Sequence, residues 1–185
     1  MSNDCTGTFT PKSRTKRVRI NIPTIYPSLL DQMAALGRRM EPVPPDGNCM
    51  FESIARQSHD YTENTHIMLR KLTCIRGRVE SERFRGFLAH HKRDQYLSEI
   101  NKLEKNGVWD IDIGDVAIMI LQQVVNRKIV VLRNRQKPLI FPDDGVLIND
   151  DDLVILQDDF QTHYDSTRLL YWPDGKMFTY NCYLL

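Results

Sequence analysis

The chain has 185 residues, of which 41% are hydrophobic and 26% charged, and its net charge at pH 7 is +1. These values are ordinary for one globular domain that is long enough to bury a core. The small net charge disfavours a dedicated nucleic-acid binder, and no run of about 18 apolar residues would span a membrane.

The N-terminus and the cysteines bear on the cellular compartment in which the protein is expected. The polar N-terminus lacks the apolar core of a signal peptide. The four cysteines are widely separated and include no Cys-x-x-Cys pair. This spacing disfavours a disulfide framework and a structural zinc site. We therefore expect a reducing intracellular compartment, the cytoplasm or nucleus.

The first predicted segment, residues 1–19, is rich in Ser, Thr, Lys and Arg and has no hydrophobic period. This composition indicates a disordered basic arm. Residues 20–185 are then expected to form a single domain, which we expect to be a monomer.

Helices are predicted before strands. Apolar spacing favours helices over Tyr26 to Met40, from Cys49 onward, and over a segment capped by Thr62 or Asn64 that carries Ile67, Met68, Leu72 and Ile75. A charged helical stretch through Phe84, Leu88, Tyr96, Ile100 and Leu103 is expected to be solvent-exposed. Asp115 to Val125 is apolar almost all round and is predicted to be a buried helix.

Short β-branched runs separated by Asp- and Asn-containing turns predict the strands. The fold class expected from this order is α/β (α+β), with a mixed β-sheet sandwiched between helical segments. The predicted strands are Lys128 to Leu132, Pro138 to Phe141, Leu153 to Leu156, Thr167 to Trp172 and Met177 to Leu185.

Cys49 follows a run of turn-forming residues, Pro44 to Asn48, and precedes helical patterning. It is therefore expected at a helix N-terminus, where unpaired N–H groups and the helix dipole favour a thiolate over a thiol. The same turn would leave Asp46 and the amides of Gly47, Asn48 and Cys49 to line an oxyanion site. The alternative is an ordinary Asp-Gly turn with Cys49 as a small buried hydrophobe.

A second motif lies 114 residues downstream. His163 and Asp165 precede a strand-like run, and residues i and i+2 of an extended segment share a face. An imidazole held by a carboxylate can accept a thiol proton, as in cysteine hydrolases. The alternative for an isolated His-x-Asp is a solvated strand end.

Together the two motifs resemble those of the OTU (ovarian tumour) family of deubiquitinating cysteine proteases. Residues 46–51, Asp-Gly-Asn-Cys-Met-Phe, are similar to the family's Asp-Gly-Asn-Cys-Leu-Phe, and residues 163–166 to its His-Tyr-Asn/Asp-Ser. The segment 107–109 and the helix and strand that follow resemble the family's Gly-x-Trp segment, helix and core strand. The resemblance covers roughly residues 40–172.

The resemblance implies a papain-like OTU fold and hydrolysis of isopeptide bonds at the ubiquitin C-terminus without a cofactor or metal. The implied partners are ubiquitin, polyubiquitin chains or a ubiquitin-like protein. By motif, Cys49 is the nucleophile, His163 the general base, Asp165 its orienter and Asp46 a support for the cysteine loop. Substrate-binding roles are implied for Trp109, Asp110 and Tyr164.

The chain departs from the family pattern at three positions. Glu52 stands where Arg is common, Asp110 replaces the Gly after Trp, and Gly114 occupies the place of a frequent Glu. These changes leave every implied catalytic group in place. They bear instead on the substrate channel and on which linkages are accepted.

Other interpretations remain. A non-catalytic ubiquitin-binding module on the same fold is the main alternative, and a nucleic-acid factor would rest only on Lys12 to Arg19. His163-x-Asp165 could open a two-histidine iron site, but no histidine follows. His90-His91 is better explained as a solvated helix surface, and His66 by capping or packing.

Overall fold

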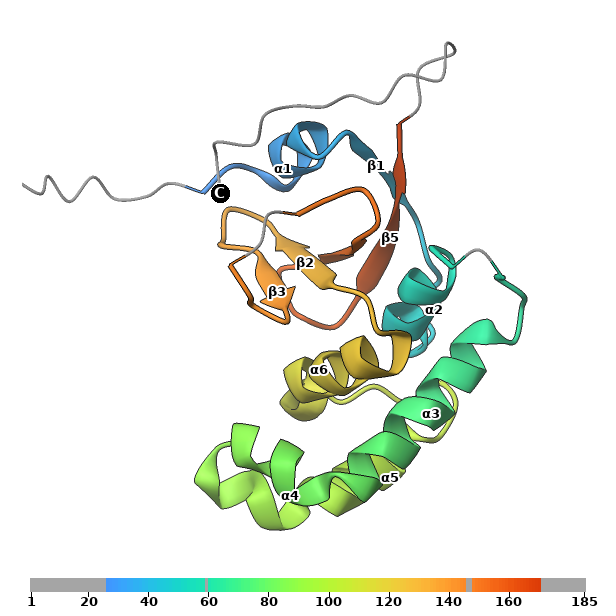
Figure 1. The fold of residues 1–185 in the computed structure, drawn as a ribbon, viewed down its shortest axis with the longest axis vertical. Helices are drawn as coiled ribbons and strands as arrows, with labels where there is room; N and C mark the ends of the chain where they lie inside the picture. Colours follow the sequence, from blue (N-terminus) through green and yellow to red (C-terminus); the bar gives the residue numbers. More distant parts are fainter. Residues whose placement is uncertain (1–25, 59, 146–147, 171–185) are drawn as a thin grey trace, which may run out of the picture.

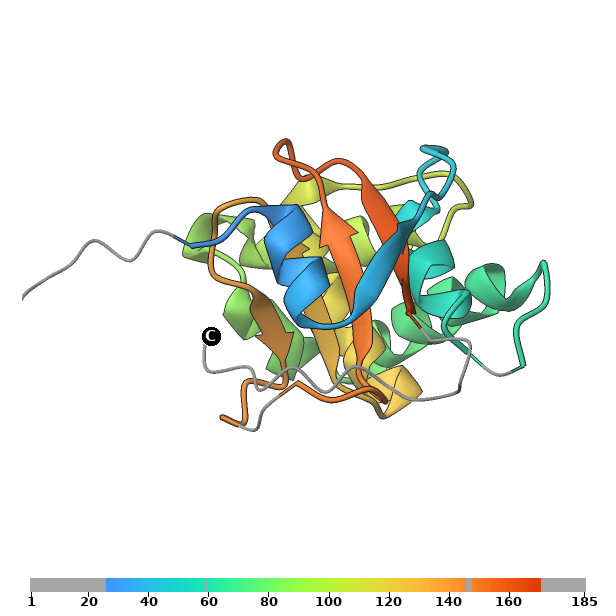
Figure 2. The same ribbon diagram turned by 90° about the horizontal axis from the view of Figure 1, so that it is seen from above.

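The computed structural model describes residues 26–58, 60–145 and 148–170. In this part of the chain a mixed five-stranded sheet lies between one helix on one face and a layer of several helices on the other (Figures 1 and 2). The strands are β1 (Arg38–Glu41), β2 (Ile129–Arg133), β3 (Leu139–Phe141), β4 (Leu153–Gln157) and β5 (Tyr164–Leu169). Their order is β1-β5-β4-β2-β3, with β2 and β4 parallel and the other pairs antiparallel. The predicted fold class is confirmed.

The helices cover both faces of the sheet. One face carries α1 (Leu29–Ala35), and the other carries α2 (Cys49–Ala55) and α6 (Gly114–Val125), with α3 (Thr65–Val79) packed against both (Figure 1). The remaining helical segments are α4 (Ser81–Phe84), η1 (Arg85–Phe87), η2 (His90–Gln95), α5 (Tyr96–Leu103) and η3 (Ile111–Ile113).

The central strands explain why helices pack on both faces of the sheet. Alternate residues of a strand point to opposite faces, so Ile129 and Val131 of β2 join the larger core under α2, α3 and α6. Val130 and Leu132 join the smaller core, where Met33 of α1 packs. A strand buried on both faces is continuously apolar, as β2 is from Ile129 to Leu132.

The helix predicted over Tyr26 to Met40 is wrong in its last part. The helix ends at Ala35, Gly37 takes a φ of +60°, and Arg38–Glu41 pairs with β5. The left-handed glycine stops the helix, and backbone pairing to the sheet outweighs the helical spacing of the apolar residues.

The helical expectations for residues 62–103 were right in type and wrong in orientation. Met68, Leu72 and Ile75 of α3 are exposed, whereas the helix buries Leu69, Arg70, Thr73, Cys74 and Gly77. Small residues let α5 and α6 approach closely: a Cβ on Gly77 would lie 3.0 Å from Ile100 and 3.2 Å from Ile120. The stretch expected to be exposed breaks into short helices that bury Phe84, Leu88, Tyr96, Ile100 and Leu103.

One predicted helix and three predicted strands agree closely with the structure. The helix at Asp115 to Val125 is confirmed as α6, and β2, β3 and β4 agree with their predicted runs to within one residue. The strand predicted at Thr167 to Trp172 begins earlier, at Tyr164. The basic arm, residues 1–19, and the run from Met177 to Leu185 lie outside the described residues. Among the helices of the described ranges, none combines the length and the apolarity needed to cross a bilayer.

Candidate active site

Cys49 is the first residue of α2, as predicted, and its side chain is 1% exposed. The loop before it turns through Gly47, whose φ of +76° suits glycine. The hydroxyl of Ser53 on α2 donates a 3.0 Å hydrogen bond to the backbone carbonyl of Tyr164, the first residue of β5. The nucleophile predicted from sequence therefore lies where α2 begins and β5 begins.

Burial changes the expected charge state of this thiol. Burial raises the pKa of the Cys49 thiol, and the hydrogen bonds from Tyr164, Met50 and Cys49 lower it without cancelling that effect. The carboxylate of Asp46 adds a further small increase. The helix terminus thus acts in the predicted direction, but it does not by itself make Cys49 a thiolate, because desolvation of the anion costs more.

His163 and Asp165 form the predicted pair. The Nε2 of His163 lies 3.1 Å from Oδ1 of Asp165. The same Oδ1 accepts a hydrogen bond of 2.9 Å from the backbone N–H of Val43, which leads into the cysteine loop. With Nε2 as the donor, Nδ1 of a neutral imidazole is an acceptor. This Nδ1 is buried and has no hydrogen-bond partner within the described ranges.

Asp46 organises the cysteine loop from the solvent side. Its Oδ1 accepts the backbone N–H of Asn48 at 2.9 Å, and its Oδ2 accepts the side-chain amide of Asn48 at 3.2 Å. Burial raises the pKa of Asp46, but these hydrogen bonds outweigh it, so the pKa is lowered overall. The Asn48 backbone N–H is thus engaged by Asp46.

A backbone contact joins the cysteine loop to the Gly-x-Trp segment. The N–H of Gly107 donates to Oδ1 of Asn48 at 3.0 Å. A Cβ built on Gly47 would lie 2.1 Å from the carbonyl oxygen of Gly107. Only glycine at position 47 allows the two chains to come this close, so the two motifs form one structural unit.

Trp109 and Tyr164 lie beside the site. Their rings meet edge to face with centroids 5.4 Å apart, and both line a pocket of about 200 Å³. Asp110 lies outside this lining and accepts a hydrogen bond from the N–H of Asp112. The carboxylates that do line the pocket belong to Asp112 and Asp115, which sequence reasoning did not assign.

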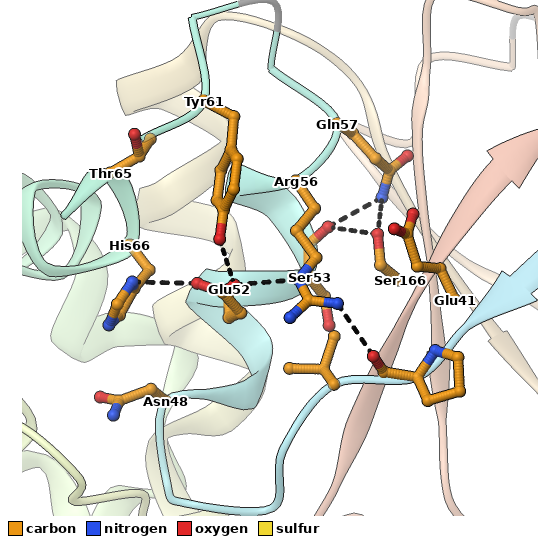
Figure 3. A network of polar contacts seen from close by, with 12 residues as sticks. Glu41, Asn48, Glu52, Ser53, Arg56, Gln57, Tyr61, Thr65, His66 and Ser166 are labelled. Carbon is orange, nitrogen blue, oxygen red and sulfur yellow. Dashed lines mark hydrogen bonds and ion pairs between the residues drawn. The ribbon is translucent and has the colours of Figure 1, made fainter. Parts of the chain in front are cut away.

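Glu52 forms a buried polar network on α2, one turn after Cys49 (Figure 3). Its carboxylate lies 2.9 Å from Nε of Arg56 and 2.9 Å from Nδ1 of His66, and it accepts a 2.7 Å hydrogen bond from the hydroxyl of Tyr61. The carboxylate of Glu52, which stands where Arg is common in the family pattern, is thus paired with Arg56 and His66. His66 is explained by this network.

Sequence reasoning missed Arg70, the largest fully buried side chain of the described residues. Its position in the helical pattern carries no signal of burial, because arginine is ordinarily exposed. His90 and His91 are exposed on η2, as expected. The described residues include no cluster of three or more His, Cys, Asp or Glu side chains that could hold a metal ion.

Comparison with solved structures shows the same fold. The OTU domain of OTUD1 is 15% identical with a TM-score of 0.58, and the match covers 76% of this chain and 94% of that one. The OTU of Hazara virus, solved bound to ubiquitin, is 16% identical with a TM-score of 0.56 over 78% and 86%. The viral OTU domain protease from Dera Ghazi Khan virus is 18% identical with a TM-score of 0.59 over 77% and 85%.

A search of curated proteins gives no match. The family model of OTU-like cysteine proteases matches residues 44–153, more than half of the chain. This range contains the cysteine loop, the Gly-x-Trp segment and α6. With the family's fold around those motifs, the chain belongs to the OTU-like cysteine protease family.

Proposed function

We propose that this protein is a deubiquitinase that cleaves isopeptide bonds at the ubiquitin C-terminus through Cys49, His163 and Asp165. The observation that carries the proposal is the position of Cys49: it begins α2, and Ser53 of the same helix donates a hydrogen bond to the carbonyl of Tyr164, the residue between His163 and Asp165. Ubiquitin as the partner is supported by the family and by the ubiquitin complex of the Hazara virus OTU.

The first half of the reaction forms a thioester. Nδ1 of His163 takes the thiol proton, the sulfur attacks the carbonyl carbon of the Gly–Lys bond, and the carbonyl oxygen becomes an oxyanion near the amide of Cys49. The imidazolium then gives its proton to the lysine nitrogen, the C–N bond breaks and the amine leaves. Asp165 holds the ring through Nε2 and stabilises its positive charge.

The second half releases ubiquitin. His163, again neutral, removes a proton from water, and the hydroxide adds to the thioester carbonyl. The C–S bond breaks, the sulfur leaves and is reprotonated by His163, and ubiquitin departs with a free carboxylate. A reducing compartment suits this chemistry, because Cys49 and Cys74 are both free thiols.

The substrate tail is proposed to pass Trp109 and Tyr164. The ubiquitin tail is narrow, ends in two glycines and carries arginine just before them. The pocket beside these rings combines aromatic walls with the carboxylates of Asp112, which is paired with Lys92 at 2.6 Å, and of Asp115. We propose that Asp115 and the rings receive the arginine side chain, since a carboxylate pairs with guanidinium and aromatic rings stack on it.

A ubiquitin probe with a C-terminal electrophile tests the proposal. We expect one adduct per chain, located at Cys49 by mass spectrometry and blocked by iodoacetamide. Cys74→Ala is the matched control, because Cys74 is also buried and burial raises its thiol pKa to about 11; this variant should label normally. Alkylation of Cys49 without any ubiquitin or ubiquitin-like adduct would contradict the proposal that ubiquitin is the substrate. If Cys49 reacted with neither reagent, the alternative of a non-catalytic ubiquitin-binding module would be favoured.

The dependence of Cys49 on His163 gives a pH prediction. Burial raises the pKa of the thiol, so the anion forms near neutral pH only with help from a base. The rate of alkylation by iodoacetamide should rise with pH through the apparent thiol pKa. In His163→Ala the midpoint should move upward by about 1 to 3 pH units, because a neighbouring imidazolium no longer favours the thiolate.

His66→Ala is the control for that measurement. His66 pairs with Glu52 and lies close enough to Asp46 to lower its pKa slightly, so its removal also deletes an imidazole near the loop. We expect the midpoint of Cys49 alkylation to stay where it is in wild type. Equal midpoints in His163→Ala and wild type would remove His163 from the role of base.

A further inference from the structure

Arg70 is an arginine with no access to solvent. It lies on the buried face of α3, and its side chain is 1% exposed. Figure 1 shows α3 running beside α2, the helix that Cys49 begins. The guanidinium carbon lies 4.6 Å from the ring centroid of Phe51, two residues after Cys49. Arg70 is thus beneath the cysteine loop, on the protein side.

The guanidinium joins two segments far apart in sequence. One terminal nitrogen donates to the carbonyl of Gly47 and, at 3.0 Å, to Oδ1 of Asn48. The other donates to carbonyls of the segment that leads to Trp109. The acceptors there are Leu103 at 2.6 Å, Lys105 at 3.1 Å and Val108 at 2.6 Å.

The charge of Arg70 is not neutralised by a carboxylate. Within the described ranges, the ion pairs closer than 4.0 Å do not include Arg70. Burial lowers its pKa, while the negative forms of Cys74, Asp46 and Cys49 act in the opposite direction. Burying an unpaired cation is costly, and a hydrocarbon side chain would pack against Phe51 without that cost.

We propose that Arg70 is a positioning residue for catalysis: its planar fork fixes the cysteine loop against the 103–108 segment, and its charge favours the Cys49 thiolate. This inference rests on the proposed role of Cys49 as the nucleophile.

Arg70 orients the cysteine loop through the peptide bond between Gly47 and Asn48. A peptide is planar, so anchoring the carbonyl of Gly47 also sets the direction of the N–H of Asn48. That N–H donates to Asp46, and the side chain of Asn48 is held by Arg70, Gly107 and Asp46 together. The start of α2, and with it the amide proposed to face the oxyanion, is thereby fixed before substrate binds.

Two substitutions separate geometry from charge. Arg70→Lys keeps a cation but cannot donate to both segments in one plane, and Arg70→Met keeps length without charge. We expect kcat on a ubiquitin substrate to fall by about 10²-fold in both, with KM little changed. The pH midpoint of Cys49 alkylation should rise in Arg70→Met and stay near the wild-type value in Arg70→Lys.

Arg78→Met is the matched control. Arg78 lies on the same helix and ties it to Glu104 through hydrogen bonds of 2.8 and 3.1 Å, without contacting the cysteine loop. Its kcat should stay within about twofold of wild type, as for an exposed ion pair. A purely structural role of Arg70 predicts a lower melting temperature with wild-type kcat per folded molecule and an unchanged alkylation midpoint.

Folded Arg70→Lys or Arg70→Met with wild-type kcat would overturn the proposal. If neither variant folds, Asn48→Ala decides, because it removes the Oδ1 acceptor from the loop side; wild-type kcat there would also overturn it. The proposed function is tested separately on the unmodified protein. If wild type reacts with the ubiquitin probe and the Arg70 variants react equally fast, only the inference about Arg70 fails.

Discussion

Cys49→Ala should abolish hydrolysis of ubiquitin chains, with a loss of kcat of about 10⁴-fold or more. Deleting a nucleophile removes the covalent route, and the residual rate comes only from binding and oxyanion stabilisation. The change deletes one sulfur atom from a side chain that is 1% exposed, so it alters little of the packing and almost none of the surface. We therefore expect folding and ubiquitin affinity to be nearly intact, which circular dichroism and a binding titration would check.

The control for this variant is Cys74→Ala. Cys74 is fully buried on α3 and loses the same sulfur, so any effect of a small cavity on the fold should be at least as large there. Its turnover per folded molecule should match wild type. Comparable turnover by Cys49→Ala and wild type would exclude Cys49 from the mechanism.

Gly47→Ala is expected to have the second largest effect. The new Cβ would lie 2.1 Å from the carbonyl oxygen of Gly107, and both partners of the clash are backbone atoms. The cysteine loop must then move away from the Gly-x-Trp segment, which misplaces Cys49. We expect kcat/KM to fall by about 10²-fold or more, and the free energy of unfolding to fall by about 3 kcal/mol or more.

Gly145→Ala separates the clash from the backbone strain. Gly145 has a φ of +70°, close to the +76° of Gly47, but a Cβ there meets nothing within 4 Å. In Gly145→Ala the free energy of unfolding should fall only by the strain of a left-handed alanine, about 1 to 2 kcal/mol. Its kcat should stay at the wild-type value. Chemical denaturation and steady-state kinetics of both variants give the comparison. Equal losses of activity would show that strain, and not the contact with Gly107, is what matters.

The helical segments show how far local patterns reach. Apolar spacing identified α2 and α6 with their buried faces, because those helices lie directly on the sheet and their apolar residues have one place to go. The same reasoning chose the wrong face for α3. There the buried face includes Arg70, Thr73, Cys74 and Gly77 besides Leu69, and at Gly77 the absence of a side chain lets α5 and α6 approach closely.

The candidate active site also shows which features depend on local sequence and which on tertiary packing. The i, i+2 spacing predicted that His163 and Asp165 could pair, and they do. The prediction that a helix terminus would favour the Cys49 thiolate left out burial. Burial by the surrounding domain raises the pKa of the thiol, and the backbone amides do not cancel this effect. A pKa depends on the desolvation of the group, and desolvation is a property of the whole packing.

By itself the sequence determined the local turns, the helix that begins at Cys49, the pairing of His163 with Asp165 and the resemblance to a known family. Each depends on residues close together in the chain. Only the tertiary structure brought Gly47 against Gly107, buried Arg70 beneath the cysteine loop and matched Glu52 with His66. These contacts join α2, α3 and the segment before Trp109, and their chemistry follows from packing that no local period encodes.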